Sequence, residues 1–454
     1  MAVVSVGKLS ETGRHQRLDA EFYQPQYFID FSKGDWEPIR EFLEICQYGI
    51  SQAMIEEPKG CSIFRMDDIK DCFLLDDEVK YIEIPKEAFG QFKLEINDVL
   101  FNRVNAEEFV GRTGIFKLSG DYVFASYLIR LRVKPDCQIL PDYLNIFLNT
   151  KFGKKQIRRF SRRAVNQANV NAEELRNFRI VLIPLEIQSQ ICQLSDEAWS
   201  KIELSKSLYS QAENLLLEEL RLKDFKPKYA LSYTANLSKA FGVRRVDAEY
   251  FQPAYEQVIK RVVDYQDGYT TLLRCVETVR ADFDPTKYSD NSFYYVELAD
   301  IDASIGIIHS RSEIKGEEAP SRARRVLRRD DIIVSSVEGS LEKVALVDEE
   351  HEGSLASTGF FQFRARATYP EVLLLLLKSI VLQAQLKREC AGTILTAVSN
   401  DSLKKILIPL LPHETQQKIV SLVQQCHKAR KKAKELLEEA KRKVEQAIET
   451  ASLN

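Results

Sequence analysis

Several motifs that enzymes need are missing from this sequence of 454 residues. No two prolines are adjacent, which excludes the Asn-Pro-Pro-aromatic motif of enzymes that methylate amino groups. No GxxxxGK(S/T) loop occurs, so ATP-driven movement is not built into the chain. The five histidines are scattered, form no HExxH motif and leave no Ser or Cys triad visible. The sequence therefore gives no sign of an active site of its own.

Cysteine pairs and long apolar runs are also lacking. The eight cysteines form no CxxC pair and have no zinc-like spacing to histidine, and no secretory leader is visible, so we expect reduced thiols in the cytoplasm. The most apolar stretch, residues 372–382, is short and contains Lys378, so we expect a buried helix and no membrane partner. A net charge of -3 and a pI of about 6.1 do not indicate nucleic-acid binding by the chain as a whole. The local distribution of charge must decide.

The most informative feature that is present is an internal repeat. RLDAEFYQPQY at residues 17–27 and RVDAEYFQPAY at residues 245–255 are identical at seven of eleven positions and lie 228 residues apart. Downstream, DVLFNRV at residues 98–104 aligns with DIIVSSV at residues 331–337. Similar signatures close the two copies, LIPLEIQ from residue 182 and LIPLLPHETQ from residue 407. A period this long predicts two globular domains rather than a solenoid.

Each copy is predicted to be a strand-rich α+β domain. A proline loses no needed N–H at the first turn of a helix, so Pro25 and Pro253 predict helix starts. Short alternating runs, bounded by Gly, Asp and Pro, predict strands at residues 79–84, 123–133, 293–298 and 332–337. Helical patterns return at residues 141–163 and 370–389. Because shared residues build a scaffold, the repeated DAE-aromatic-aromatic-QP motif is assigned to structure, docked against the long helices described next.

A long helical pattern follows each copy. Apolar and small residues recur at steps of three and four from Ile187 to Leu220 and from Ile419 to Ala447. Alanines at 433, 440 and 447 permit close approach of a second helix, so we expect the two helices to pair with each other as a coiled coil. The predicted division is a first domain at 1–184, a central helix at 185–224, a return linker at 225–244, a second domain at 245–410 and a C-terminal helix at 411–454.

The repeat, with its Ile-Pro-Leu and Glu-x-Gln signatures, resembles the specificity (S) subunit of type I restriction-modification systems over nearly the whole chain. Tyr48-Gly49 and the VSN run at residues 398–400 add to the likeness, whereas the first copy lacks the usual glycine within residues 164–171. The resemblance implies two target recognition domains with pseudo-twofold symmetry, each reading half of a bipartite DNA sequence. It also implies that the two helices pair antiparallel and bind two methyltransferase subunits. Adenine N6 methylation with S-adenosylmethionine, and restriction with ATP and Mg by motor-nuclease subunits, would then belong to partners.

The strongest local signal for DNA binding is a basic stretch at residues 151–163, which has seven Lys and Arg and no acidic residue. On a helix these cations would fall within one half of the wheel, opposite Ile157 and Phe160. A solvated helix normally includes acidic residues, so the stretch favours phosphate contacts over an ordinary surface face. The candidate residues are Lys151, Lys154, Lys155, Arg158, Arg159, Arg162 and Arg163.

Further candidates come from turns and from the second copy. Base readout pairs arginine with guanine and Asn or Gln with adenine. In the first copy these could be Asn102, Arg103, Asn105, Arg112, Asn166 and Gln167, each with a turn or cap role as the alternative. The basic run at residues 322–329 leaves DNA contact and a solvated rim equally open. The candidates of the second copy are Arg322, Arg324, Arg325, Lys343, Lys387 and Arg388.

We interpret the chain as a non-catalytic subunit that clamps duplex DNA, with no cofactor or metal site of its own. A protein-protein scaffold built on a coiled coil, and an enzyme with an unrecognised hydrolytic site, remain as rivals. A nuclease site from Asp302, Glu313 and Lys315 is disfavoured because acid followed by acid-x-lysine is common in a chain with 29% charged residues.

Overall fold

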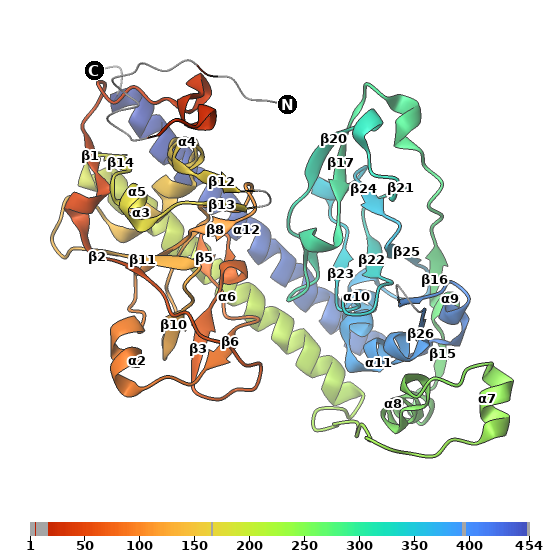
Figure 1. Cartoon of the computed structure of the whole chain (residues 1–454). Coiled ribbons are helices and arrows are strands. Elements are labelled where there is room, and N and C mark those ends of the chain that lie inside the picture. Colours follow the sequence, from red (N-terminus) through yellow and green to blue (C-terminus); the bar gives the residue numbers. More distant parts are fainter. Residues whose placement is uncertain (1–4, 6–16, 165–166, 393–395, 452–454) are drawn as a thin grey trace. The chain divides into compact units, whose positions relative to one another are not determined.

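Two compact units make up the chain in the computed structural model, which describes residues 5, 17–164, 167–392 and 396–451 (Figure 1). One unit is Met1–Ile202 with Lys431–Asn454, and the other is Glu203–Arg430. Each unit holds one copy of the repeat and part of both long helices. The division between the units therefore falls inside the long helices, not at their ends.

The first unit is built around a six-stranded sheet. Its strands are β2 (Leu43–Tyr48), β4 (Ile69–Lys70), β5 (Phe73–Leu74), β7 (Val99–Asn102), β9 (Thr113–Ile115) and β11 (Leu128–Val133), in the order β2-β11-β7-β9-β5-β4. Alternate residues of a strand point to opposite faces. Val99 and Phe101 therefore enter one core, whereas Leu100 enters another.

Smaller sheets complete this unit. A three-stranded sheet has the order β10-β3-β6, from β3 (Cys61–Phe64), β6 (Lys80–Ile82) and β10 (Tyr122–Phe124). A second, which we call the hairpin sheet, joins β12 (Arg162–Ala164), β13 (Gln167–Asn169) and β8 (Val104–Asn105). The strand β1 (Trp36–Pro38) pairs with β14 (Arg179–Val181).

The second unit repeats this topology. Its main sheet has the order β16-β25-β22-β23-β19-β18, from β16 (Val276–Thr278), β18 (Ile301–Asp302), β19 (Ile307–Ile308), β22 (Asp331–Ser335), β23 (Val344–Leu346) and β25 (Phe360–Ala365). The second sheet has the order β20-β17-β24-β21, from β17 (Ser292–Val296), β20 (Ser312–Lys315), β21 (Ala323–Val326) and β24 (Leu355–Ser357). The pairs β26 (Cys390–Ala391) with β27 (Ala397–Val398) and β15 (Tyr269–Thr271) with β28 (Leu407–Pro409) complete it. The predicted duplication is confirmed by the matching strand order of the two main sheets, whereas β21 is an additional strand of the second unit.

The shorter helices differ from the predicted ones at their breaks. The pattern at 141–163 forms α3 (Pro141–Asn149) and α4 (Lys151–Phe160), and that at 370–389 forms α10 (Pro370–Lys378) and α11 (Ile380–Glu389). Thr150 and Ser379 between them have extended backbones, and the Thr150 hydroxyl accepts a hydrogen bond from the Gly153 N–H at 3.4 Å. Each predicted single helix is thus two helices, and Arg162 and Arg163 lie in strand β12.

The remaining short helices lie in both units. They are α2 (Lys86–Phe92), α5 (Ala172–Arg176), α7 (Leu237–Val243), α8 (Pro253–Val263) and α9 (Leu272–Cys275). Pro253 begins α8 as predicted, but Pro25 begins only a short 3-10 helix, Pro25–Tyr27. The predicted linker at 225–244 contains α7 and is therefore partly helical.

Two long helices, α6 (Leu185–Glu219) and α12 (His413–Ala451), contribute to the core of each unit. In the first unit Ile191 and Ala198 of α6 share a core with Ala440 and Val444 of α12. In the second unit Ala212 and Leu216 share a core with Val423 and Cys426. The start of one helix packs with the end of the other, so they run antiparallel. None of the described helices is long and apolar enough to cross a membrane.

Strand pairing also corrects the alignment of the closing signatures. Leu407–Pro409 forms β28, whose counterpart is β14 at Arg179–Val181. The prolines that immediately precede the long helices are therefore Pro184 and Pro412. Gln188 donates to the carbonyl of Ile183 at 2.9 Å, and Gln416 donates to that of Leu411 at 2.8 Å. The shared Leu-Ile-Pro letters misled the sequence alignment, because the two glutamines, not those letters, hold equivalent places.

Candidate nucleic-acid interface

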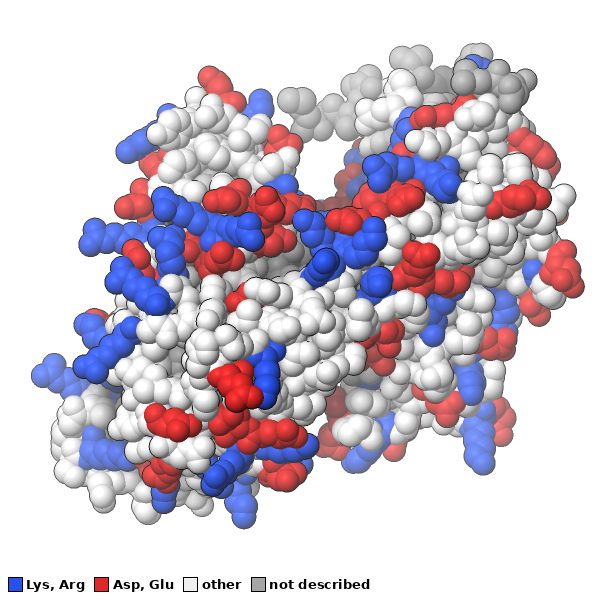
Figure 2. All heavy atoms as spheres, turned by 180° about the vertical axis from the view of Figure 1, so that it is seen from behind, with Lys and Arg blue, Asp and Glu red and all other residues white. Residues whose placement is uncertain are grey.

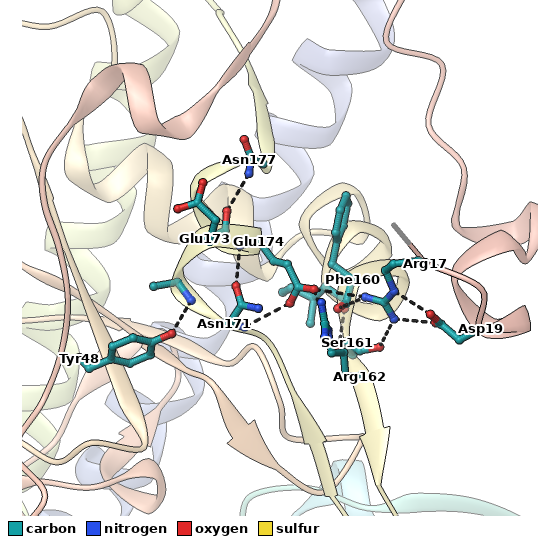
Figure 3. Close-up of polar contacts among 12 residues, drawn as sticks. Arg17, Asp19, Tyr48, Phe160, Ser161, Arg162, Asn171, Glu173, Glu174 and Asn177 are labelled. Atoms are coloured by element: carbon teal, nitrogen blue, oxygen red, sulfur yellow. Dashed lines mark hydrogen bonds and ion pairs between the residues drawn. The ribbon is translucent and has the colours of Figure 1, made fainter. Parts of the chain in front are cut away.

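The repeated motif holds the end of a helix in each unit, and Figure 3 shows the contacts in the first unit. The Arg17 guanidinium donates to both carboxylate oxygens of Asp19 at 2.8 and 2.6 Å, and to the carbonyls of Phe160 and Ser161 at 2.8 and 3.3 Å. These hydrogen bonds satisfy carbonyls at the C-terminal end of α4. The bonds from Arg17 also lower the pKa of Asp19.

The second copy repeats this arrangement. Arg245 donates to Asp247 at 2.8 Å and to the carbonyls of Arg388 and Cys390 at 3.3 and 2.7 Å, at the end of α11. The motif is therefore structural, but it docks on α4 and α11 and not, as we expected, on the long helices.

Two of the predicted DNA contacts belong to this scaffold. The Arg159 guanidinium lies 4.6 Å from the ring centre of Phe22 and 4.2 Å from that of Phe28, and the residue is only 9% exposed. The equivalent Arg388 lies 4.5 Å from the ring centre of Tyr250 and donates to its carbonyl at 3.3 Å. Each guanidinium stacks on a motif aromatic. Arg159 and Arg388 are therefore part of the scaffold and are not candidates for DNA contact.

The hairpin sheet brings several of the other candidates together. Its register sets Arg162 opposite Asn169, Arg163 opposite Ala168, and Ala168 opposite Asn105. Neighbouring residues of a strand point to opposite faces, so Arg162 and Arg163 cannot extend one cationic face of α4. Gln167 is exposed at the start of β13. Asn166 lies outside the described residues.

Two glutamates position the arginines of this sheet. Glu107 lies 2.7 Å from the Arg163 guanidinium and 3.5 Å from that of Arg158, which also donates to the Glu107 carbonyl. Glu174 lies 3.0 Å from Arg162 and 3.4 Å from Arg17 (Figure 3). One carboxylate thus faces two guanidiniums in each case. At Glu107 the two guanidiniums outnumber the carboxylate, which favours anion binding, whereas at Glu174 the Asp19 carboxylate balances the second guanidinium.

A sequence signal points to Glu174, but none points to Glu107. Asn171 and Glu174 form a capping box at the start of α5, with the Asn171 side chain accepting from the Glu174 N–H at 2.8 Å. Beside it, the hydroxyl of Tyr48 accepts from the Ala172 N–H at 2.8 Å (Figure 3). The Arg103 guanidinium lies 4.8 Å from the Tyr48 ring centre. Tyr48, one of the residues that carried the family resemblance, thus contacts both α5 and Arg103 beside the candidate interface.

The remaining first-copy candidates are more dispersed. Lys151 pairs with Glu449 at 2.5 Å and Glu445 at 3.7 Å, both on α12. Arg112 is exposed, with its guanidinium 4.1 Å from the Phe109 ring centre. Asn102 is fully buried and donates to the Phe109 carbonyl at 3.3 Å, which makes it structural. Lys154 and Lys155 lie on α4.

Among the described residues of its hairpin, the second copy offers no comparable cluster. Arg325 is 8% exposed and donates to the Val279 carbonyl at 2.8 Å, and burial lowers its pKa. Lys343 donates to the Ile301 carbonyl at 3.1 Å. Arg325 and Lys343 therefore also leave the candidate surface.

The other second-copy candidates lie nearer solvent. Arg324 pairs with Asp284 at 2.8 Å, and Lys387 is exposed 3.9 Å from Glu249. Arg322, in the turn immediately before β21, is exposed. Acidic and basic side chains are interspersed over the face of the molecule shown in Figure 2.

The disfavoured nuclease site is not assembled. Asp302 is buried in β18, where it lies 3.4 Å from Arg430, whereas Glu313 and Lys315 lie on β20 of the other sheet. Among the described residues, no group of three His, Cys, Asp or Glu side chains could hold a metal ion.

The sequence is similar to a known protein family and to two curated proteins. The type I restriction modification DNA specificity domain matches residues 33–214 and 304–442. The chain is 28% identical over 182 residues to the protein assigned as the MjaX specificity subunit of a type I restriction enzyme in Methanocaldococcus jannaschii, covering 38% of this chain and 43% of that protein. It is 24% identical over 197 residues to the type I restriction enzyme EcoKI specificity subunit of Escherichia coli, covering 43% and 40%. The chain thus spans less than half the length of either curated relative.

Solved structures give similar matches. The HsdS subunit from Thermoanaerobacter tengcongensis is 35% identical, with 34% of this chain and 40% of that chain covered and a TM-score of 0.30. The S subunit of a type I restriction-modification system from M. genitalium is 12% identical, with 94% and 98% covered and a TM-score of 0.41. Because the specificity domain matches most of the sequence and falls once in each copy of the repeat, this chain belongs to the type I restriction-modification DNA specificity family.

Proposed function

We propose that this chain is the DNA-recognition subunit of a type I restriction-modification complex and reads one half of a bipartite DNA target with each copy. The duplicated fold carries the proposal. Both copies keep the same scaffold, with Arg17 and Arg245 holding equivalent helix ends. They differ at the hairpin, where the first has Arg162 and Arg163 and the second has Ala391 and Gly392. Equal scaffolds with different exposed side chains suit two different half-sites.

In the first copy, the phosphate contacts come from the hairpin sheet and the adjacent end of α4. Guanidinium groups bind phosphate with charge-assisted, often bidentate hydrogen bonds. Arg158 and Arg163 share Glu107, so a phosphate can bind the pair while the glutamate still orients both side chains. Gln167 and Asn105 on the same sheet have the amides that could read adenine.

Methyl transfer and cleavage are assigned to partners. The chain lacks the motifs for both reactions, so methyltransferase subunits would supply S-adenosylmethionine chemistry and motor-nuclease subunits the ATP- and Mg-dependent steps. Two methyltransferase subunits would be recruited through α6 and α12. The complex would work in the cytoplasm, without a membrane partner.

The salt dependence of DNA binding tests the recognition role. Arg162→Gln with Arg163→Gln should weaken binding to every duplex sequence and reduce the slope of log K against log salt by about 1.8, since each lost phosphate contact removes about 0.9. Arg40→Gln with Lys134→Gln removes the same charge from exposed sites of the first unit and should leave the slope nearly unchanged. A double hairpin variant with the wild-type slope would exclude this surface.

Other results would favour the rivals. If the wild-type chain has no salt-dependent affinity for duplex DNA, the scaffold hypothesis is preferred. Methylation or cleavage by the purified chain alone would contradict a non-catalytic role. Methylome sequencing of the host with and without the gene should show a bipartite motif that depends on it.

A further inference from the structure

Arg103 is a predicted base-reading residue whose position is fixed by the fold. It lies between β7 and β8, where its N–H donates to the Tyr127 carbonyl and its carbonyl accepts from the Val170 N–H, both at 3.0 Å. Its guanidinium donates from Nη1 to the Ser126 carbonyl at 3.3 Å and lies 4.8 Å from the ring centre of Tyr48. Backbone and side chain are therefore both restrained before any ligand binds.

Tyr48, whose ring lies against the Arg103 guanidinium, is restrained in turn. Its hydroxyl accepts from the Ala172 N–H at the start of α5, while the residue is still 40% exposed (Figure 3). A guanidinium stacks readily on an aromatic face. Because a side chain held in one orientation loses little conformational freedom on binding, this arrangement favours affinity for a ligand that fits it.

The guanidinium of Arg103 has hydrogen-bond donors to spare. It carries more N–H groups than any other side chain, yet among the described residues the Ser126 carbonyl is its only acceptor and no carboxylate pairs with it. Arg65 in the same unit is also half-buried, but it pairs with Asp68 at 3.3 Å and donates to the Glu78 carbonyl at 2.9 Å. A cation that is partly removed from water without a counter-charge is costly, so an acceptor outside the chain would stabilise Arg103.

Arg103 also shares a face of the hairpin sheet with Arg163, an arginine of the proposed phosphate site. Residues two apart on a strand point to the same face, so Arg103 and Asn105 lie together. Residues directly opposite each other across an antiparallel pair also share a face, and the register sets Ala168 opposite both Asn105 and Arg163. A duplex held at its phosphates by Arg163 would therefore bring base edges towards Arg103.

The second copy keeps this backbone but not the guanidinium. Ser336 takes the place of Arg103 in the aligned DIIVSSV segment, and its N–H donates to the Gly359 carbonyl at 2.9 Å, as that of Arg103 does to the Tyr127 carbonyl. The Ser336 hydroxyl donates to the same Gly359 carbonyl at 2.8 Å. This hydroxyl is thus used within the second unit, so the two copies differ in what the position can bind.

We propose that Arg103 determines specificity in the first copy by reading a guanine, with Tyr48 as its positioning residue. Guanine presents two acceptors, O6 and N7, side by side in the major groove, and a planar guanidinium can contact both with parallel hydrogen bonds. Adenine places a donor beside its N7 acceptor and therefore matches the guanidinium less well. The inference rests on the proposed function and adds one base of one half-site.

Selection of duplexes from a randomised library by the full chain, followed by sequencing, measures the base preference at each position. Arg103→Lys keeps the charge but loses the planar fork, so the preference for guanine over the other bases should fall about 5- to 140-fold at one position of the target. The slope of log K against log salt should stay unchanged, because no phosphate contact is lost. Arg65→Lys, at a half-buried arginine with a carboxylate partner, is the matched control and should keep every preference.

Variants of Tyr48 separate positioning from stability. Tyr48→Leu removes the ring against the guanidinium and should reduce the same guanine preference, whereas Tyr48→Phe keeps the ring and should retain it. A merely structural role would lower the melting temperature without changing the preference at a single position. If Arg103→Lys fails to fold, the two Tyr48 variants still decide.

The outcomes separate this inference from the function on which it rests. A wild-type chain that selects a bipartite sequence, together with an Arg103→Lys variant that selects the same sequence equally strongly, overturns the assignment of Arg103 and leaves the recognition role standing. Uniform weakening for all sequences with a smaller salt slope assigns Arg103 to phosphate and also overturns the inference. A wild-type chain that selects no sequence overturns the proposed function itself.

Discussion

Asp98 and Asp331, the buried aspartates of the two main sheets, should contribute different amounts to the free energy of unfolding, because their side-chain partners differ. Asp98, 1% exposed, accepts from Arg132 at 2.7 and 2.8 Å and lies 3.8 Å from Arg130, which is 3% exposed. Asp331, fully buried, accepts from Arg364 at 3.0 and 3.3 Å and from the neutral Gln362 at 2.7 Å. The first site buries two cations beside its carboxylate, whereas the second has one, which is partly exposed.

Removing each carboxylate should therefore destabilise its unit for a different reason. Asp98→Ala leaves the charge of Arg130 in the core. Carbonyl and amide oxygens accept hydrogen bonds from its guanidinium but do not neutralise the charge. Burial already lowers the pKa of this guanidinium. Breaking a buried pair in this way costs about 3–5 kcal/mol. After Asp331→Ala, Arg364 can turn to water, so the cost is that of unmade buried hydrogen bonds, about 1–3 kcal/mol.

Native-state hydrogen exchange read by mass spectrometry measures both costs, because β7 with β11 reports on the first unit and β22 with β25 on the second. Each substitution should lower protection in its own unit only. The control Glu95→Ala removes an exposed partner of Arg132, at 2.8 Å, and should cost less than about 1 kcal/mol. Equal costs for Asp98→Ala and Asp331→Ala would refute the reasoning.

Two further outcomes follow from buried polar groups. Burial lowers the pKa of Lys378 to about 8. Between pH 8 and 10 the unfolded chain therefore binds more protons than the folded chain, and the free energy of unfolding of the second unit increases as the pH rises. Urea unfolding at the two pH values should show this increase in the wild type but not in Lys378→Met. Gln188 accepts from the Leu140 N–H and donates to two carbonyls at the start of α6, whereas Gln416 donates to one carbonyl and accepts from one hydroxyl at the start of α12. Gln188→Ala should therefore lower the melting temperature more than Gln416→Ala, and an equal decrease would contradict this ranking.

The duplication and the pairing of the two long helices could be predicted from the sequence, because the first is a similarity between two segments and the second depends on a periodic pattern within each helix. It did not carry the break at Thr150, which has neither Gly nor Pro to mark it and depends on a threonine cap. Nor could it distinguish Arg159 from Arg158. Arg159 is buried because Phe22 and Phe28, far upstream, supply its aromatic contacts.

The same limit applied to the candidate site. A basic stretch without acidic residues in the sequence was expected to form a bare cationic face. In the fold, Glu107 and Glu174 arrive from other segments and pair with Arg163 and Arg162. Spacing along the chain cannot predict such partners, because they are set by how the strands of the hairpin sheet meet.

The comparison of the two copies separates scaffold from surface more sharply than either copy does alone. Two pairs of equivalent residues keep both their identity and their contacts, namely Arg17 with Arg245 and Asp98 with Asp331. Each pair therefore has the same structural role in both units. At the hairpin the copies share strand pairing but not side chains. Where the backbone is the same in both copies but the side chain differs, the side chain is not needed to build the core. If each copy reads its own half of a DNA target, the side chains at such positions can make the two halves different. Exchange of the hairpin residues between copies should consequently alter DNA preference without altering the stability of either unit.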